Sequence, residues 1–274
     1  MLMNQPGFHK CDDYLKDKLR EGVTGEPISI LVQYRKELDE AKKIQLEEEL
    51  TACGCEVHSR FSPIDTHSVT LPANELPRLM AHRDVIQLTY DRVLKALLNH
   101  AIPTIQPPYA TAHCHDEQMY TGKGVGIAIL DSGIYPHHDL TCPENRIVAF
   151  KDFIQGRENP YDDNGHGTHV AGCAAGNGMA SRGAYRGAAY EASLIGIKIL
   201  DRDGMGKMSK ILEGVNWIIQ NKEVYNIRVL SLSLGGVPIN PHHSDPLCQM
   251  LEIAWQEGIV VVVAAGNNGP EQGK

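Results

Sequence analysis

Three polar side chains stand at positions where the sequence could support chemistry. Asp131 directly follows the apolar run GVGIAIL, and Asn267 directly follows the run VVVAAG. His166 lies between glycines in NGHGTH, which leaves room around its imidazole. These types supply a carboxylate that orients, a base that moves protons and an amide that donates to a developing oxyanion. Together they would suit acyl transfer.

Each of the three residues also has an ordinary structural explanation. Asp131 precedes Ser132-Gly133 and could cap a turn, while Asn267 opens NNGP, a strong turn sequence. His166 and His169 could form a zinc pair, but the glutamate of the H-E-x-x-H motif is missing. We expect His169 to be a packed helix residue. The catalytic interpretation therefore depends on whether the three side chains meet.

The elements around these residues predict how they would meet. Apolar runs without alternation favour strands, and helical patterns lie between them. Such strands predict an α/β fold in which helices cover both faces of a parallel sheet. Ligands bind beyond the carboxyl ends of such strands, where Asp131 and Asn267 would lie. The expected strands are residues 124–130, 194–200, 228–234 and 259–265, and the expected helices are 165–175, one capped by Ser209, and one from Asp245-Pro246 to Gly258.

Four ordered blocks carry a family resemblance: ILDSGIYPHHDL, DDNGHGTHVAG, LSLSLGG and VVAAGNNGP. Over about residues 120–274 they resemble the signature blocks of the subtilases, the subtilisin-like serine proteases of peptidase family S8. The intervening YRGAAYEASLIGIKIL is similar to intracellular subtilases of the AprX type. The resemblance implies a subtilisin-like parallel sheet, a polypeptide substrate and a serine endopeptidase that forms an acyl-enzyme.

The resemblance also implies roles for individual residues. Asp131 would hold the tautomer of His166, His166 would be general base and then general acid, and Asn267 would donate to the oxyanion. Gly204 and Gly206 resemble the edge segment that pairs with a substrate strand, although both could simply serve turns. The two backbone walls of the substrate pocket would be Ser233, Leu234 and Gly235 on one side and Ala264, Ala265 and Gly266 on the other.

The first half of the chain has a different texture. Its expected strands are residues 28–34, 56–61, 66–71 and 85–91, with helices at 37–50 and from Asn74. The order β-α-β-β-α-β is that of a small ferredoxin-like α+β domain. The helical segment 37–50 is predicted from its apolar residues Leu38, Ala41, Ile44 and Leu50. In subtilases such a domain is a propeptide that inhibits its own enzyme, and a tail near residues 95–107 would lie in the cleft.

These patterns give a domain organisation and one departure from the family. We expect an extension at 1–27, the propeptide-like domain at 28–91, a linker and processing region at 92–121, and the N-terminal part of the catalytic domain at 122–274. The sequence contains no Gly-Thr-Ser-Met-Ala-type block. We therefore expect a truncated fragment that is inactive and prone to aggregate. The alternatives are a non-catalytic peptide-binding remnant, and a protease inhibitor acting through its N-terminal domain.

Composition limits the remaining classes. A net charge of −8 argues against nucleic-acid binding, and no apolar run is long enough for a membrane span or a signal peptide. Seven cysteines without framework spacing favour the cytoplasm. We assign no cofactor: Asp139 resembles a family calcium ligand, but the loop 176–186 supports no clear site. The cluster at 113–116, which consists of His113, Cys114, His115 and Asp116, could suggest a metal site, but we interpret it as part of the exposed linker.

Overall fold

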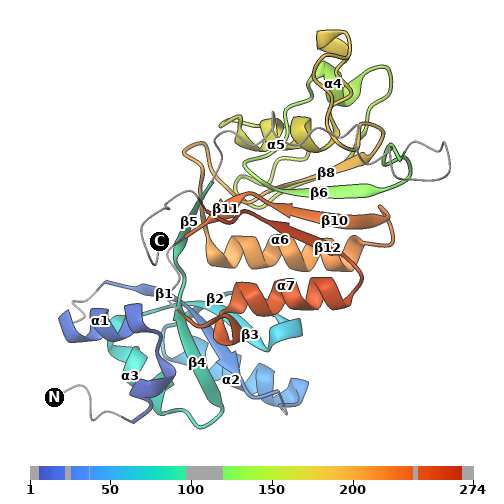
Figure 1. Cartoon of the computed structure of the whole chain (residues 1–274). Helices are drawn as coiled ribbons and strands as arrows, with labels where there is room; N and C mark the ends of the chain where they lie inside the picture. Colours follow the sequence, from blue (N-terminus) through green and yellow to red (C-terminus); the bar gives the residue numbers. More distant parts are fainter. Residues whose placement is uncertain (1–5, 22–25, 37, 97–119, 237–239, 267–274) are drawn as a thin grey trace. The chain divides into compact units, whose positions relative to one another are not determined.

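The computed structural model describes residues 6–21, 26–36, 38–96, 120–236 and 240–266. Asn267 and the cluster at 113–116 lie outside these ranges. The described chain forms two compact units, which we describe separately. The N-terminal unit contains residues 1–92 and 237–253, and the C-terminal unit contains residues 93–236 and 254–274 (Figure 1).

The N-terminal unit is an antiparallel sheet with helices packed against it. The sheet has the order β2-β3-β1-β4, and the predicted β-α-β-β-α-β order is confirmed. Its strands are β1 (Ile28–Tyr34), β2 (Glu56–Phe61), β3 (Thr66–Leu71) and β4 (Val85–Tyr90). Its helices are α1 (Asp13–Glu21), α2 (Glu40–Ala52) and α3 (Leu76–Ala81), with short 3-10 turns η2 (Phe8–Lys10), η3 (Ser62–Ile64), η4 (Ala73–Glu75) and η7 (His242–Ser244).

Helix α2 begins later than predicted. The Asp39 side chain accepts a hydrogen bond from the backbone N–H of Lys42, which caps the helix. Leu46 and Leu50, one turn apart, are buried, whereas Ile44 is 46% exposed. Of the apolar residues on which the helix was predicted, Leu50 is in the core and Leu38 packs against it, whereas Ile44 is exposed. The pattern was hard to interpret because charged residues occupy most of the helix surface.

Helix α1 falls in the extension for which the sequence predicted no element. The carboxylate of Asp12 accepts from the backbone N–H groups of Leu15 and Tyr90, both at 2.7 Å. One oxygen thus caps the helix while the other ties it to the end of β4. Leu15 and Leu19 are buried in the core of this unit.

The described residues 240–253 belong to the N-terminal unit and contact it through polar side chains. Arg92 forms an ion pair with Asp245 at 2.8 Å. Gln87 donates to the carbonyl of Ser244, and Gln33 donates to the side chain of Gln249. Asp245 also accepts from the backbone N–H groups that open α7 (Pro246–Gln256). Its predicted role as a helix start is confirmed.

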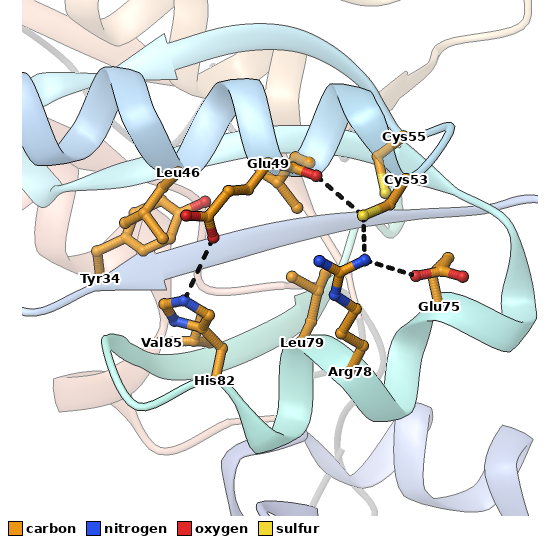
Figure 2. A pocket seen from close by; sticks show the side chains of 11 residues that line it. Tyr34, Leu46, Glu49, Cys53, Cys55, Glu75, Arg78, Leu79, His82 and Val85 are labelled. Atoms are coloured by element: carbon orange, nitrogen blue, oxygen red, sulfur yellow. Dashed lines mark hydrogen bonds and ion pairs between the residues drawn. The ribbon is translucent and has the colours of Figure 1, made fainter.

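A pocket in the N-terminal unit lies beneath α2 and α3 and is lined by Tyr34, Leu46, Cys53, Cys55, Leu79 and Val85 among others (Figure 2). Its rim is polar. The Cys53 thiol donates to the carbonyl of Glu49 and is contacted by the Arg78 guanidinium, while His82 faces Glu49 at 3.8 Å. These polar groups pair with one another, and the pocket contains neither Asp131 nor His166.

The C-terminal unit is built on a parallel sheet with the order β12-β10-β6-β8-β7. The predicted strands are all present, and β7 is an edge strand that the sequence did not reveal because its residues IVAFKD mix apolar and charged types. The strands are β6 (Gly126–Asp131), β7 (Ile147–Asp152), β8 (Ser193–Lys198), β10 (Ile227–Leu232) and β12 (Val260–Val263). The other elements are α4 (His138–Thr141), α5 (His166–Ala175), η6 (Met179–Ser181) and α6 (Met208–Asn221).

Helices α5 and α6 cover opposite faces of this sheet (Figure 1). Ile127 and Ile129 of β6 share a core cluster with Val170 of α5. On the other face, a Cβ at Gly214 of α6 would lie 2.5 Å from the side chain of Leu130. Burial on both faces explains why the strand sequences are continuously apolar.

The start of α6 corrects one prediction. The helix begins at Met208 with Lys207 at the N-cap position, and Ser209 is buried inside the first turn. The predicted capping role of Ser209 was therefore wrong. The helix packs inward through Ile211, Leu212, Val215 and Ile218, which are buried.

A small antiparallel sheet completes the C-terminal unit. Its order is β11-β5-β9, with β5 at Val93–Ala96, β9 at Met205–Lys207 and β11 at Leu234–Gly235. The sequence predicted no strand at 93–96. In the part of the chain that the structure describes, no helix combines the length and apolarity needed to cross a membrane.

Strand β12 yields the first prediction. It lies at the edge of the described sheet, and Val260, Val262 and Val263 are each more than half exposed. Because an exposed apolar edge strand can pair with other chains, Val262→Lys should increase the monomeric fraction in sedimentation velocity. Val224→Lys is the matched control, since Val224 is exposed in a turn rather than on an edge strand. An equal increase in the monomeric fraction from both substitutions would contradict the inference that β12 is the strand that pairs with other chains.

Candidate active site

Asp131 and His166 form a close pair. Asp131 is the last residue of β6 and is fully buried, while His166 is the first residue of α5. Nδ1 of His166 lies 2.6 Å from Oδ1 of Asp131, which also accepts from the backbone N–H of Ser132. Because an ionised carboxylate can only accept, Nδ1 must carry the proton. Nε2 is then the nitrogen able to take up a proton.

Glycines allow the start of the helix to approach the end of the strand this closely. Gly165 occupies the N-cap position of α5 with φ of 97°, a left-handed conformation that favours glycine. At Gly167 a Cβ would lie 2.1 Å from the carbonyl oxygen of Gly133 and 3.1 Å from the Cβ of Asp131. A side chain at 167 would therefore push His166 away from Asp131.

The strand ends beside Asp131 carry further titratable groups. In the parallel register Lys198 of β8 lies opposite both Asp131 of β6 and Asp152 of β7. Lys198 is fully buried, which is rare for a lysine and requires partners. We did not predict this lysine from the sequence, where the signal was a charged residue within the apolar run SLIGIKIL.

Asp152 anchors the loop that follows β7. Its carboxylate accepts from the backbone N–H groups of Ile154, Gln155 and Arg157 and from the hydroxyl of Tyr161. Burial opposes ionisation, but these hydrogen bonds outweigh it and hold the pKa of Asp152 below its usual value. Burial, followed by the bond to Asp152, raises the pKa of Tyr161.

The structure assigns different roles to the two glycines of the edge segment. Gly206 lies in β9 and partners Leu94 of β5; a Cβ there would lie 2.2 Å from the carbonyl oxygen of Ile199. Gly204 lies in the preceding turn with φ of 73° and donates to the carbonyl of Asp201. The alternative of a simple turn therefore describes Gly204, whereas Gly206 is part of a strand that pairs with an extended segment.

The remaining candidate residues follow neighbouring parallel strands. Ser233, Leu234 and Gly235 follow β10, with the last two in β11, whose partners in β5 are Ala96 and Lys95. Ala264, Ala265 and Gly266 follow β12, and the N–H of Ala264 donates to the carbonyl of Leu232. Since β10 also pairs in parallel with β6, both segments lie at the carboxyl-terminal end of the sheet, where Asp131 ends β6. Asn267 follows Gly266 but lies outside the described residues.

A guanidinium lies where the sequence suggested calcium. Arg146 donates to the carbonyl oxygens of Ala175, Ala192 and Asp139. The carboxylate of Asp139 accepts from the backbone N–H of Ala180 at 2.6 Å. Across the described ranges no group of three or more His, Cys, Asp or Glu side chains could hold a metal. The backbone carbonyl groups around Asp139 are thus joined by the Arg146 guanidinium.

The structure also bears on two other expectations from the sequence, the packing of His169 and the state of the cysteines. His169 is exposed on α5, with its Nδ1 3.9 Å from the thiol of Cys173, so the prediction of a packed histidine was wrong. The outward position follows from its place on the solvent side of a helix whose inner side bears Val170 and Ala171. The cysteines within the described ranges are free thiols.

Comparison with known proteins identifies the family of this chain. Residues 122–274 match the model of the subtilase family, Peptidase_S8. Serine protease AprX of Bacillus subtilis is 44% identical over 219 residues, covering 78% of this chain and 48% of the relative. Subtilisin E of the same species is 30% identical over 243 residues, covering 87% and 59%. The chain thus spans about half of these relatives.

One solved structure is a cold adapted subtilisin-like serine proteinase. It is 31% identical to this chain, with a TM-score of 0.43. The match covers 54% of this chain and 48% of that protein.

Arg146 yields the second prediction. Arg146→Met removes the side-chain donor from three carbonyl groups, of which that of Asp139 keeps the N–H of Asn177, and should lower the free energy of unfolding by about 2 kcal/mol. Chemical denaturation measures the loss, and Arg228→Met, at an exposed arginine, is the control. A chelator should leave the melting temperature of the unaltered chain unchanged. A marked fall on chelation would contradict the role given to Arg146.

Asp152 yields the third prediction, which concerns pH. A lowered pKa contributes stability above the ordinary aspartate pKa, near 4, and this contribution is lost as pH falls through the folded-state value. Asp152→Asn should therefore destabilise the chain at pH 7 but have a smaller effect at pH 3. Urea denaturation at both pH values tests this, with the exposed Asp203→Asn as control. An undiminished difference at pH 3 would count against it.

Proposed function

Because the chain belongs to the subtilase family, we propose that it forms the N-terminal part of a serine endopeptidase in which Asp131 orients His166. The observation that carries the proposal is the 2.6 Å contact between Asp131 Oδ1 and His166 Nδ1. A buried carboxylate fixes the imidazole tautomer and stabilises the imidazolium that forms during acyl transfer.

The mechanism follows from this arrangement. Nε2 of His166 accepts the hydroxyl proton of a serine as its oxygen attacks the scissile carbonyl. The imidazolium then gives that proton to the leaving amine, which breaks the peptide bond and leaves an acyl-serine. A water molecule, deprotonated by the same nitrogen, releases the acid. The amide of Asn267 would donate to the oxyanion of each tetrahedral intermediate.

The nucleophile is the part that this sequence does not supply. It contains no Gly-Thr-Ser-Met-Ala-type block. The hydroxyl of Ser132, which follows Asp131, is already hydrogen-bonded to Asp162 and to the N–H of Gly167. We infer that the 274-residue chain is inactive by itself and that the serine belongs to a segment outside it.

The substrate would be a polypeptide in extended conformation. Strand β5 lies antiparallel between β9 and β11, so two backbone edges already accept a strand between them. Such pairing gives affinity through main-chain hydrogen bonds, and side-chain pockets add preference. The walls at 233–235 and 264–266 would form the pocket beside the scissile bond.

The N-terminal unit would act as an intramolecular inhibitor. Residues 93–96 of β5 follow directly after this unit and occupy the groove that we assign to substrate. The free thiols of the described cysteines are consistent with a reducing compartment, and we place the protein in the cytoplasm.

The fourth prediction tests this function. The chain should be joined to the serine-containing C-terminal part of Serine protease AprX from Bacillus subtilis. We expect the chimera to react with a fluorophosphonate probe and to cleave a fluorogenic peptide. His166→Ala should reduce cleavage roughly a millionfold, as removal of this histidine does in subtilisin. The 274-residue chain alone should show neither activity.

The outcomes separate the competing functions. Cleavage of the peptide by the 274-residue chain would contradict the inference that this chain lacks the nucleophile. A folded but unreactive chimera would contradict the endopeptidase proposal. If the chain alone inhibited intact subtilisin at micromolar concentration, the inhibitor function would gain support.

A further inference from the structure

The loop before His166 contains two adjacent aspartates, Asp162 and Asp163, whose carboxylates bind different partners. Asp162 and Asp163 precede His166 by four and three residues. Asp162 faces the start of α5, and Asp163 contacts the buried Lys198.

Asp162 gathers donors from both sides of the pair. Its Oδ1 accepts from the hydroxyl of Ser132 at 2.9 Å and from the N–H groups of Asn164 and Gly165. Its Oδ2 accepts from the N–H and the hydroxyl of Thr168, at 2.9 and 2.5 Å. Burial opposes ionisation, but hydrogen bonds led by Thr168 outweigh it and lower the pKa of Asp162.

Lys198 is hydrogen-bonded to the same region. Its ammonium donates to the carbonyl oxygens of Ser132 and Leu200, at 2.6 and 2.8 Å, and to Oδ1 of Asp163 at 2.6 Å. A fully buried ammonium is costly unless every proton has a partner, and here each of its three protons can meet an oxygen. The cation therefore joins the end of β6 to the loop before His166.

Ser132 is the residue where the two tethers meet. Its carbonyl accepts from Lys198, and its hydroxyl accepts from the N–H of Gly167 and donates to Asp162. Ser132 follows Asp131 directly, and Gly167 follows His166 directly. The residues that come after the two members of the pair are thus hydrogen-bonded to each other.

We propose that Asp162 and Lys198, acting through Ser132, are positioning residues that hold Asp131 and His166 in contact before any substrate binds. This inference rests on the proposed function, since it concerns the same pair. Site geometry needs to be held to about 0.5 Å by supporting groups. Asp131 comes from a strand and His166 from a helix, so a single 2.6 Å contact between them would not fix both elements.

The experiment uses the 274-residue chain with 15N-labelled histidine and needs no peptidase activity. The 15N shifts of the His166 ring report which nitrogen carries the proton, and His166→Ala identifies the signals. In the unaltered chain we expect the Nδ1–H tautomer that donates to Asp131. Asp162→Asn and Lys198→Met should lose this preference and give a mixture of tautomers.

Milder variants protect the test against simple unfolding. Ser132→Ala removes only the bridging hydroxyl, and Asp163→Ala removes the partly exposed partner of Lys198. Their matched controls are Asp203→Ala, at an exposed aspartate, and Lys222→Met, which breaks an ion pair between Lys222 and Glu257. Circular dichroism identifies the variants that remain folded, and only those are compared.

The outcomes decide the proposal. Loss of the Nδ1–H preference in folded Ser132→Ala or Asp163→Ala chains, with the preference kept in both controls, supports it. If both Ser132→Ala and Asp163→Ala fold and keep the Nδ1–H preference, the proposal is overturned. It is also overturned if the unaltered chain lacks this preference. An inactive chimera would refute the endopeptidase while leaving this spectroscopic result intact, so the two proposals can fail separately.

Discussion

The hydrogen bond between Asp131 and His166 is the interaction on which the other features of the C-terminal unit depend. It joins the end of a buried parallel strand to the first turn of a helix on one face of the sheet. Such a bond forms only where the helix can approach the strand without a side chain between them, as Gly167 permits. The small residues of α5 and the fully buried β6 are therefore requirements of the site as much as of the core.

The sequence predicted those elements whose pattern is local. Continuous apolar runs predicted the central strands, and Asp131 and His166 were found from their positions at strand and helix ends. Residues that work through distant partners escaped prediction. Lys198 lay inside the expected strand 194–200, and its role was not predicted because its partners Ser132 and Asp163 are distant in the sequence. Strand β5 is too short to show a period and exists only through pairing with β9 and β11.

Positive charge has two separate structural uses in this unit. Lys198 and Arg146 both extend into backbone carbonyl groups, one beside Asp131 and the other beside Asp139. Lysine suits the first position because a compact ammonium reaches three oxygens around a point. Arginine suits the second because its planar fork spans carbonyls from separate segments. Exchanging the two types would satisfy neither site.

Strand β5 also determines how the groove would behave toward other peptides. Because β5 belongs to the same chain, its effective concentration at β9 and β11 is of the order of millimolar, far above that of a dilute peptide in solution. Any peptide must compete for the same main-chain donors and acceptors. Cutting the chain after β5 would end that advantage, because the released strand could diffuse away. Under the proposed function, this covalent link would be what makes β5 an inhibitor of the substrate groove.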